Sequence, residues 1–233
     1  MIQTPCQRKI GPFQCCSVVE GDCLELMKLL PDKCVDLVLT SPPFLDEDVN
    51  GDYWLLFDSW WKEIGRMAAL YSLIIHSPRR VEHIFKNYPP FRMMVWGKNF
   101  SSYTFRFNPI YVYRYGEPNP NRLIWSDTFG CQPVMKQDKQ HPYQDPDLLY
   151  LTLVEMFRDC ETILDPFMGS GTTAIACMSA GRHFLGFEVN SEYAEISRRR
   201  ISEVLAQGNL FQPKAEQQPM FAEYRDGTVE KIR

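Results

Sequence analysis

Short apolar runs alternate with amphipathic segments along this chain, a pattern that is typical of an α/β domain. In the first third, the runs 17–19, 35–39 and 71–76 predict strands, and the segments 23–30 and 53–70 predict helices between them. The segment 53–70 has a heavily aromatic face, which we expect to pack against a sheet. The order of these elements predicts strands joined through helices, as in a mostly parallel sheet.

The same alternation returns near the C-terminus. The runs 162–164 and 183–187 predict two more strands, with a helix at 174–178 between them and a further helix after Ser191. Serine at that position is a suitable N-cap. From 207 the sequence is polar and rich in Gln and Pro. We therefore predict one domain over 1–206 and a loosely ordered tail over 207–233.

Composition places the chain among ordinary globular proteins. Of its 233 residues, 45% are hydrophobic and 23% are charged, which suits a single α/β domain with a full core. No apolar run approaches the roughly 20 residues that a membrane-spanning helix needs. The first residues also lack the apolar core of a signal peptide. We expect a cytoplasmic protein without a membrane partner.

Eight cysteines raise the question of disulfides or metal binding. They contain no Cys-x-x-Cys pair and are scattered through the predicted elements. The sequence therefore predicts reduced thiols and no metal site. The positions are Cys6, Cys15, Cys16, Cys23, Cys34, Cys131, Cys160 and Cys177.

A glycine-containing turn over 165–173 follows the strand predicted at 162–164 and precedes a helix. Gly169 and Gly171 let the backbone approach a ligand closely, and Thr172 and Thr173 are candidate caps for the helix. A phosphate-binding P-loop would have lysine after its last glycine, and threonine stands there instead. The turn is suited to a small molecule other than a nucleoside triphosphate.

Two carboxylates flank this turn. Glu188 ends the strand predicted at 183–187 and lies 23 residues after Asp165, close to the roughly 20 residues expected before a ribose-binding acid. Two negative charges disfavour a pyrophosphate and favour a cationic, ribose-bearing ligand such as S-adenosylmethionine. Glu188 would accept from the ribose hydroxyls, and Asp165 would lie toward the sulfonium and amino end. Alone, the turn also suits other α/β domains.

A second motif, Thr40-Ser41-Pro42-Pro43-Phe44, ends the strand predicted at 35–39. Two prolines fix φ and remove two backbone donors, which stiffens the loop and directs the carbonyls of Ser41 and Pro42. Acceptors beside an aromatic ring are what methylation of an exocyclic amine requires, because the acceptors bind the N–H groups and the ring stacks on the base. Alone, Ser-Pro-Pro is also an ordinary proline-stiffened loop.

Together, the two motifs resemble those of the amino-directed DNA methyltransferases. The catalytic motif precedes the cofactor motif, as in the permuted β class, in which the recognition region lies between them. The segments 20–23 and 141–144 also match family motifs, so the resemblance covers 20–44 and 141–201. It implies a Rossmann-like fold that binds S-adenosylmethionine, with a seven-stranded mixed sheet and helices on both faces.

The resemblance also implies roles for individual residues. The target base would swing out of double-stranded DNA before methyl transfer. The implied catalytic residues are Ser41, Pro42, Pro43 and Phe44. The implied cofactor-binding residues are Asp22, Cys23, Thr40, Ser41, His141, Pro142, Asp165, Pro166, Phe167, Gly169, Ser170, Gly171, Thr172, Glu188 and Val189.

Serine ahead of the two prolines is the usual residue of the cytosine-N4 enzymes, although family members with Ser-Pro-Pro that act on adenine N6 exist. The chain could also be a non-catalytic cofactor- or DNA-binding relative, or a protein or RNA amine methyltransferase. The intact motif argues against the non-catalytic relative, and the motif order against the protein or RNA enzyme. Cys6 lies in a Pro-Cys-Gln resembling the nucleophile motif of C5-cytosine methyltransferases, but no glycine motif precedes it, as that family requires.

Charge is distributed unevenly along the chain. The net charge is −4 with an isoelectric point near 5.6, but the segment 79–122 carries +6 and eleven aromatic residues. Such a segment suits phosphate contacts and base stacking. Within it, 103–115 predicts a β-hairpin, with half of its aromatics in the core and half facing DNA. The preferred DNA contacts are Arg79, Arg80, Lys98, Asn99 and Arg122.

The region 45–140 is too short for a large recognition domain, so we expect DNA contacts and recognition from short loops within it. The best candidate is 116–140, which could instead be a surface connection. A run at 198–200 contains three arginines and is more typical of a solvated helix face than of a DNA contact. Open partners are a homodimer, a cognate restriction endonuclease and, through 207–211, the replication sliding clamp. A histidine at position 76 is expected to be structural.

Overall fold

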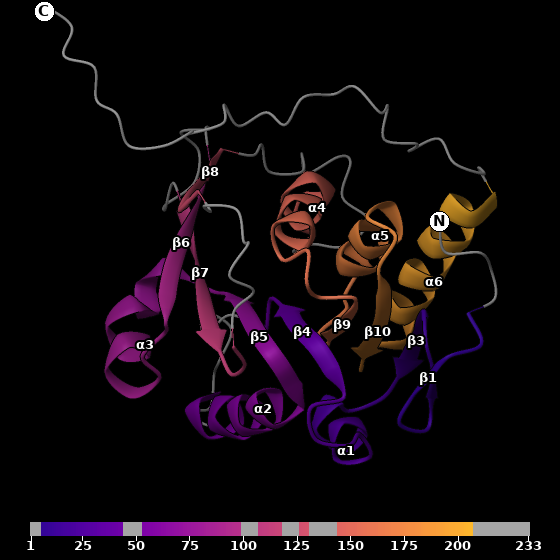
Figure 1. Ribbon diagram of the computed structural model, residues 1–233, viewed down its shortest axis with the longest axis horizontal. Helices are drawn as coiled ribbons and strands as arrows, with labels where there is room; N and C mark the ends of the chain where they lie inside the picture. The colour runs from indigo at the N-terminus through magenta and orange to yellow at the C-terminus, as the bar shows by residue number, and fades with distance from the viewer. Residues whose placement is uncertain (1–5, 44–52, 99–106, 118–125, 131–143, 207–233) are drawn as a thin grey trace, which may run out of the picture.

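A twisted eight-stranded sheet forms the centre of the molecule (Figure 1). The computed structural model describes residues 6–43, 53–98, 107–117, 126–130 and 144–206. The strand order in the sheet is β3-β10-β9-β4-β5-β7-β6-β8. The strands are β3 (Ser17–Glu20), β4 (Val35–Thr40), β5 (Ala68–Ile75), β6 (Arg92–Gly97), β7 (Phe107–Arg114), β8 (Thr128–Gly130), β9 (Thr162–Asp165) and β10 (His183–Glu188).

The sheet has a parallel half and a largely antiparallel half. From β3 to β5 every neighbouring pair is parallel, whereas β7 is antiparallel to both β5 and β6. The chain leaves β4 toward β5 on one side and leaves β9 toward β10 on the other. The boundary between β4 and β9 is therefore a topological switch point, the position at which open α/β sheets generally bind ligands, at the carboxyl ends of the strands.

Helices cover both faces of the sheet, as Figure 1 shows. α1 and α2 lie on one face, and α4, α5 and α6 lie on the other. Successive residues of β4 serve the two faces: Leu37 and Leu39 pack with the α4–α5 side, while Val38 packs with the α2 side. The helices are α1 (Cys23–Lys28), α2 (Tyr53–Met67), α3 (Val81–Asn87), α4 (Asp147–Met156), α5 (Thr172–Ser179) and α6 (Ser191–Ala206), with a 3₁₀ turn η2 (Pro78–Arg80).

The predicted α/β class and Rossmann-like layering are confirmed, with differences in detail. The main sheet has eight strands rather than seven, because β8 pairs with β6 at the edge. The helix predicted at 53–70 ends at Met67, since Ala68 already pairs with Val35 of β4. Pairing with a neighbouring strand outweighs the helical pattern of the last three residues.

The segment predicted as a hairpin over 103–115 is also different. Its described part forms one strand, β7, whose antiparallel partners are β5 and β6. Tyr111 and Tyr113 are buried there, while Tyr115 is 36% exposed. Burial of the first two follows from the position of β7 between two strands under the α2 and α3 side. The described aromatics of β7 are thus mostly core.

Two helix starts also differ from the predicted caps. Asn190, rather than Ser191, caps α6, because its Oδ1 accepts from the backbone N–H groups of Glu192 and Tyr193. At α5 the N-cap is Gly171, which has no side chain to cap with. Among the described residues, no helix is long and apolar enough to cross a membrane.

A small hairpin precedes the main sheet. Its strands are β1 (Lys9–Ile10) and β2 (Phe13–Gln14), joined by a two-residue turn in which Gly11 has φ +56°. The segment after β2 joins the main sheet through the backbone N–H of Cys16, which donates to Phe184 O at 2.7 Å. The N-terminal hairpin is therefore anchored on β10.

Candidate active site

The two sequence motifs meet at the switch point. β4 and β9 are paired through Leu37–Ile163 and Val38–Leu164, so their carboxyl ends lie side by side. Thr40, the last residue of β4, donates its hydroxyl to Asp165 Oδ1 at 2.6 Å. Both groups are buried. The loop that begins at Ser41 and the turn that begins at Asp165 are thus joined directly, although 125 residues separate Thr40 from Asp165.

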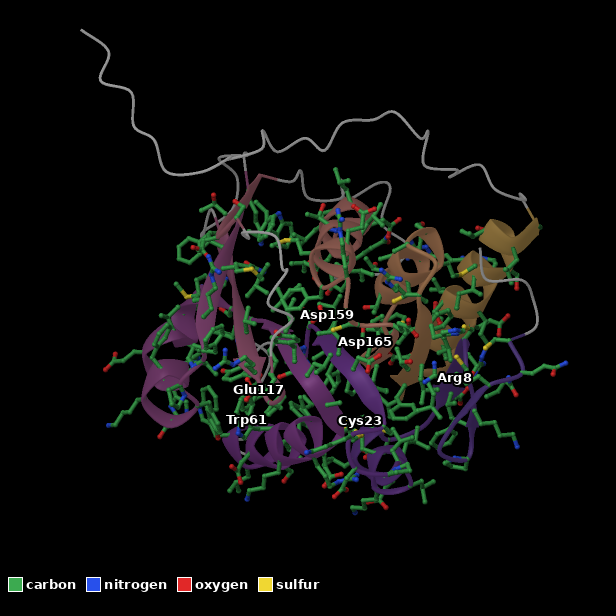
Figure 2. All side chains as sticks on the ribbon, in the orientation of Figure 1. Arg8, Cys23, Trp61, Glu117, Asp159 and Asp165 are labelled. Atoms are coloured by element: carbon green, nitrogen blue, oxygen red, sulfur yellow. The ribbon has the colours of Figure 1, made fainter. Side chains whose placement is uncertain are left out.

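Asp165 is an organising residue of this junction. Its side chain is 3% exposed and lies in the interior (Figure 2). Besides Thr40, the carboxylate accepts from Phe167 N at 3.0 Å and from the Thr173 hydroxyl. Burial raises the pKa of Asp165 to about 6, against the lowering effect of these three hydrogen bonds. Its hydrogen-bonding capacity is therefore largely used within the protein.

The glycine turn has the backbone geometry that its sequence predicted. Gly169 and Gly171 have φ of +53° and +87°, in the left-handed region that favours glycine. A Cβ on Gly171 would lie 2.9 Å from Ser197 Cβ, so α6 packs where a side chain would stand. The turn is also tied to β10, because Met168 N donates to Phe187 O at 2.8 Å.

Glu188 lies at the carboxyl end of β10, beside the turn. Its two oxygens accept from Gly169 N at 2.7 Å and from Asn190 N at 2.9 Å. Each carboxylate oxygen has two acceptor positions, so capacity remains for further donors. The next residue, Val189, is 70% exposed. Glu188, which can accept further hydrogen bonds, is therefore followed directly by an exposed apolar side chain, Val189.

Arg200 holds the other side of the glycine turn. It is 8% exposed, donates from Nη1 to Ser170 O at 2.7 Å, and donates from Nη2 to both carboxylate oxygens of Asp147 at 2.8 and 2.9 Å. The arginine run predicted as a solvated face is therefore mixed. Arg199 is exposed and Arg198 is half-buried, but Arg200 links α6, α4 and the turn. These charge-assisted hydrogen bonds tie the three elements together.

The loop after β4 is held by a chain of hydrogen bonds from two other elements. Tyr53, the first residue of α2, donates its hydroxyl to Pro43 O at 2.8 Å and lies 2.6 Å from His76 Nε2. His76 Nδ1 accepts from Ser77 N at 2.7 Å. A neutral imidazole that accepts at Nδ1 has its proton on Nε2, which then donates to the Tyr53 hydroxyl. His76 is buried and structural, as expected.

Tyr150 approaches the same loop from α4. Its side chain is buried, donates to Asp145 Oδ2 at 3.2 Å and hydrogen-bonds with Ser41. Burial raises the pKa of Tyr150, so the phenol stays protonated at neutral pH. Ser41 is half-buried, Pro42 is buried and Pro43 is exposed. Phe44 lies outside the described residues.

The candidate adenine-side residues lie where β3 ends. Asp22 caps α1 by accepting from Leu24 N and Glu25 N, and Cys23 is buried. Gly21 N donates to Glu188 O at 2.9 Å, which brings this segment to the end of β10. His141 and Pro142 lie outside the described residues, as do most of 116–140 and all of 207–211.

The candidate DNA contacts lie partly within the described chain. Arg79 and Arg80 belong to η2, which follows β5 at the carboxyl edge of the parallel strands. Arg79 is exposed, and the Ser77 hydroxyl accepts from its backbone N–H at 3.4 Å. Lys98 lies 4.8 Å from the centre of the Trp96 ring. Asn99 and Arg122 are outside the described residues.

Four residues of this site were not singled out as functional by the sequence. Tyr53 belongs to a segment whose aromatic face predicts core packing, and no element was predicted around Tyr150, so nothing local distinguishes either hydroxyl. His76 was expected to be a structural residue, and Arg200 was considered only as part of a run of arginines. The signal that could have identified Tyr53 is its place at the start of the helix after the predicted catalytic motif.

Comparison with known proteins agrees with this geometry. Residues 95–199 match the family model of the N6/N4 DNA methylases. The DNA adenine methyltransferase YhdJ of Escherichia coli K12 is 26% identical over 244 residues, covering 79% of this chain and 82% of that protein. The match confirms the resemblance to the amino-directed DNA methyltransferases.

Two solved structures share the fold. The PvuII DNA methyltransferase, described as cytosine-N4-specific, superposes with a TM-score of 0.65 at 17% identity, covering 82% of this chain and 91% of the other. The complex of M1.HpyAVI with S-adenosylmethionine gives a TM-score of 0.59 at 21% identity, covering 79% and 98%. At these identities the likeness establishes the fold.

Proposed function

We propose that this chain, which carries a DNA methylase domain of the N6/N4 family, transfers a methyl group from S-adenosylmethionine to the exocyclic N4 of a flipped cytosine in DNA. The observation that carries the proposal is the hydrogen bond between Thr40 and Asp165. It locks the proline-containing loop to the glycine turn at the switch point, where α/β proteins of this type bind their ligands. An acceptor loop and a cofactor turn are thereby held in a fixed relation.

The residues around the turn fit S-adenosylmethionine. Glu188 retains acceptor capacity for two ribose hydroxyls, and the exposed Val189 side chain offers an apolar surface for the adenine ring. Asp22 and Cys23 lie at the neighbouring end of β3. Asp165 acts by positioning, since its oxygens already hold Thr40, Thr173 and the turn. The other sequence-predicted contacts are Thr40, Ser41, His141, Pro142, Pro166, Phe167, Gly169, Ser170, Gly171 and Thr172.

Catalysis on this account is mainly positioning and hydrogen bonding. S-adenosylmethionine supplies a methyl group on a sulfur that already carries a positive charge. Ser41 and the Pro42 carbonyl accept the hydrogens of the target amine, which localises the nitrogen lone pair. Phe44 stacks on the flipped base. S-adenosylmethionine bound at the turn would supply the methyl group: its carbon–sulfur bond would break as the nitrogen–carbon bond forms, the neutral thioether would leave, and one amine proton held by Ser41 and the Pro42 carbonyl would pass to solvent, without a covalent enzyme intermediate.

Cytosine N4 is favoured by serine ahead of the two prolines, and adenine N6 is the alternative. The similarity to the adenine methyltransferase YhdJ supports the alternative, while the fold shared with the cytosine-N4-specific PvuII enzyme suits either base. A non-catalytic relative is disfavoured by the intact Ser41-Pro42-Pro43 loop and its dedicated supports. The partner is double-stranded DNA, and a role in restriction-modification, cytoplasmic location and a homodimer belong to the same proposal.

The test is mass spectrometry of nucleosides from DNA of a methylation-free host that expresses the full chain. We compare the wild type with Ser41→Ala and with the control Ser59→Ala, whose exposed hydroxyl donates to Leu55 O on the outer side of α2. The wild type and the control should form N4-methylcytosine. Ser41→Ala should reduce it by about a hundredfold, the usual effect of losing one hydrogen bond made in a transition state.

The product identifies the base. N6-methyladenine in place of N4-methylcytosine would retain the mechanism and change the substrate. Absence of both bases with the wild type, repeated with purified protein, cofactor and varied DNA, would contradict the proposal and favour a binding module or a substrate other than DNA.

A further inference from the structure

Four potential metal ligands lie together at the amino end of β10, away from Glu188. His183 Nδ1 is 3.5 Å from Cys6 Sγ, 3.3 Å from Cys15 Sγ and 3.7 Å from Cys16 Sγ. The sulfurs of Cys15 and Cys16 are 3.6 Å apart. All four ligand atoms lie within 4.8 Å of one another. The sequence predicted scattered thiols, and the fold gathers three of them around one imidazole.

These spacings match the edges of a zinc tetrahedron. With Zn–S near 2.3 Å and Zn–N near 2.0–2.1 Å, tetrahedral angles place two sulfurs about 3.8 Å apart and a sulfur and a nitrogen about 3.6 Å apart. The three sulfur–nitrogen distances and the Cys15–Cys16 distance lie close to these values. A zinc ion could therefore enter with small side-chain movements.

We propose that the N-terminal hairpin and β10 form a structural zinc site of three thiolates and one imidazole. Four protein ligands close the coordination sphere, which distinguishes a structural site from a catalytic one. Soft thiolate ligands with imidazole select zinc over magnesium or calcium, which prefer oxygen. The ligands are Cys6, Cys15, Cys16 and His183.

Backbone contacts place the ligands independently of any metal. Cys15 N donates to Arg8 O at 3.0 Å, which closes the hairpin; Arg8 is labelled in Figure 2. Gln14 Nε2 donates to Cys6 O, which holds the first ligand beside the second strand of the hairpin. His183 N donates to Glu161 O at 2.8 Å at the start of β10. Each ligand therefore comes from a segment held by hydrogen bonds.

The turn at Cys15 and Cys16 explains how neighbouring residues serve one site. In an extended strand, consecutive side chains point to opposite faces. Cys16 instead has φ +59°, a conformation that is uncommon for a residue with a Cβ. Both thiols then approach His183. An unusual backbone conformation that brings two thiols together is consistent with a binding function.

The zinc site would hold β3 and β10 together at their amino ends, opposite the carboxyl ends where the candidate cofactor residues lie. Cys16 directly precedes β3 and His183 begins β10, and these two strands are paired along their length. Their other ends provide Asp22 and Glu188. A metal at the amino end would fix the two strands against each other. Loss of the metal should therefore lower stability more than it alters the chemical step.

Metal content of the purified full-length chain tests the proposal. The protein is expressed with supplied zinc, purified under reducing conditions without an affinity tag that binds metal, and analysed by inductively coupled plasma mass spectrometry. We expect about one zinc per chain in the wild type and in the control Cys34→Ser, whose half-buried thiol lies outside the cluster. Cys16→Ser and His183→Ala should each retain less than about a tenth of that amount.

A second measurement covers the case in which these variants fail to fold. Replacement of zinc by Co²⁺ in the wild type should produce the visible d–d bands and the thiolate charge-transfer band of a tetrahedral cobalt–thiolate site. Wild-type protein with reduced thiols, no zinc and no such cobalt spectrum would overturn the proposal. Zinc that persists unchanged in Cys16→Ser, or a disulfide between Cys15 and Cys16 in place of metal, would overturn it as well.

Discussion

Asp165 illustrates how one buried carboxylate organises the site. The sequence predicted that it faces the cationic end of a ligand, whereas the structure surrounds it with donors from the protein. It accepts from Thr40 on β4, from Phe167 N in the turn and from Thr173 on α5. The two oxygens of this carboxylate thus connect β4, the glycine turn and α5. Sequence spacing singled out the residue, but the partners of its oxygens depend on tertiary packing.

The raised pKa of Asp165 leads to a pH-dependent stability. An unfolded aspartate titrates near 3.9, and the folded one at about 6, so between these values the folded chain binds a proton that the unfolded chain has released. The free energy of unfolding should therefore fall as pH rises from about 4 to about 6, by about 3 kcal/mol from this group. Urea unfolding of the wild type and of Asp165→Asn at several pH values measures the difference.

Asp127 provides a control, because its pKa is shifted in the opposite direction to that of Asp165. The guanidinium of Arg92 lowers the pKa of Asp127, so this exposed pair stabilises the fold at neutral pH and loses its effect as pH falls. Asp127→Asn should therefore slightly lower the free energy of unfolding at neutral pH, and this difference from the wild type should shrink as the pH falls. Equal pH dependence in the wild type and in Asp165→Asn would contradict the assignment for Asp165.

At the scale of elements, the proposed catalytic loop is held by residues from α2, from the segment after β5 and from α4. The loop follows β4, but Tyr53 of α2 binds the Pro43 carbonyl, His76 after β5 orients Tyr53, and Tyr150 of α4 contacts Ser41. Two prolines restrict φ without fixing where the loop lies relative to the sheet. These hydrogen bonds supply that position, and each comes from a residue distant in sequence.

Removal of the Tyr53 hydroxyl should separate positioning from cofactor binding. Tyr53→Phe leaves the ring in its aromatic cluster but removes the donor to Pro43 O. We expect kcat to fall about tenfold, in line with one lost positioning hydrogen bond, while the Kd for S-adenosylmethionine stays within about twofold. Steady-state methylation kinetics and calorimetric titration measure the two quantities.

The control for this variant is Tyr115→Phe. It removes a hydroxyl that hydrogen-bonds Ser72, away from the loop. Its kcat should remain at the wild-type value. A Tyr53→Phe enzyme with unchanged kcat would show that the loop does not require this support.

At the same scale, the outcomes show which elements a single sequence can predict. β4, β9 and β10 were predicted nearly to the residue, because central parallel strands are continuous apolar runs bounded by polar or glycine residues. The start of β5 was missed because Ala68 and its neighbours also fit a helix, and pairing with β4 decides between the two. The cluster of thiols around the imidazole could not be predicted, since Cys6 and His183 are 177 residues apart.

At the scale of the whole molecule, the two halves of the sheet have different tasks. The parallel half contains both motifs of the candidate site, at the carboxyl ends of β4 and β9. The other half begins after β5 with the basic segment that the sequence predicts to face DNA. η2 lies at the junction, because it follows β5 directly and β5 is the neighbour of β4. A phosphate contact at η2 would lie one strand away from the proposed catalytic loop.

This position predicts how Arg79 and Arg80 contribute to DNA binding. A contact to phosphates is independent of base sequence and releases counterions, so each lost contact should reduce the slope of log K against log salt by about one. Arg79→Ala with Arg80→Ala should therefore weaken binding to every DNA sequence at low salt and flatten its salt dependence by up to about two. Fluorescence anisotropy over a range of salt concentrations measures both effects.

A charge-matched control distinguishes local contact from loss of net charge. Lys28→Ala with Arg158→Ala removes the same charge from exposed positions at the end of α1 and before β9, toward the amino ends of the parallel strands. DNA bound at the carboxyl edge contacts neither residue, so the salt slope of this control should equal that of the wild type. Equal slopes in the wild type and in the Arg79/Arg80 variant would place the DNA elsewhere, because counterion release depends on which cations touch phosphate and not on the total charge of the protein.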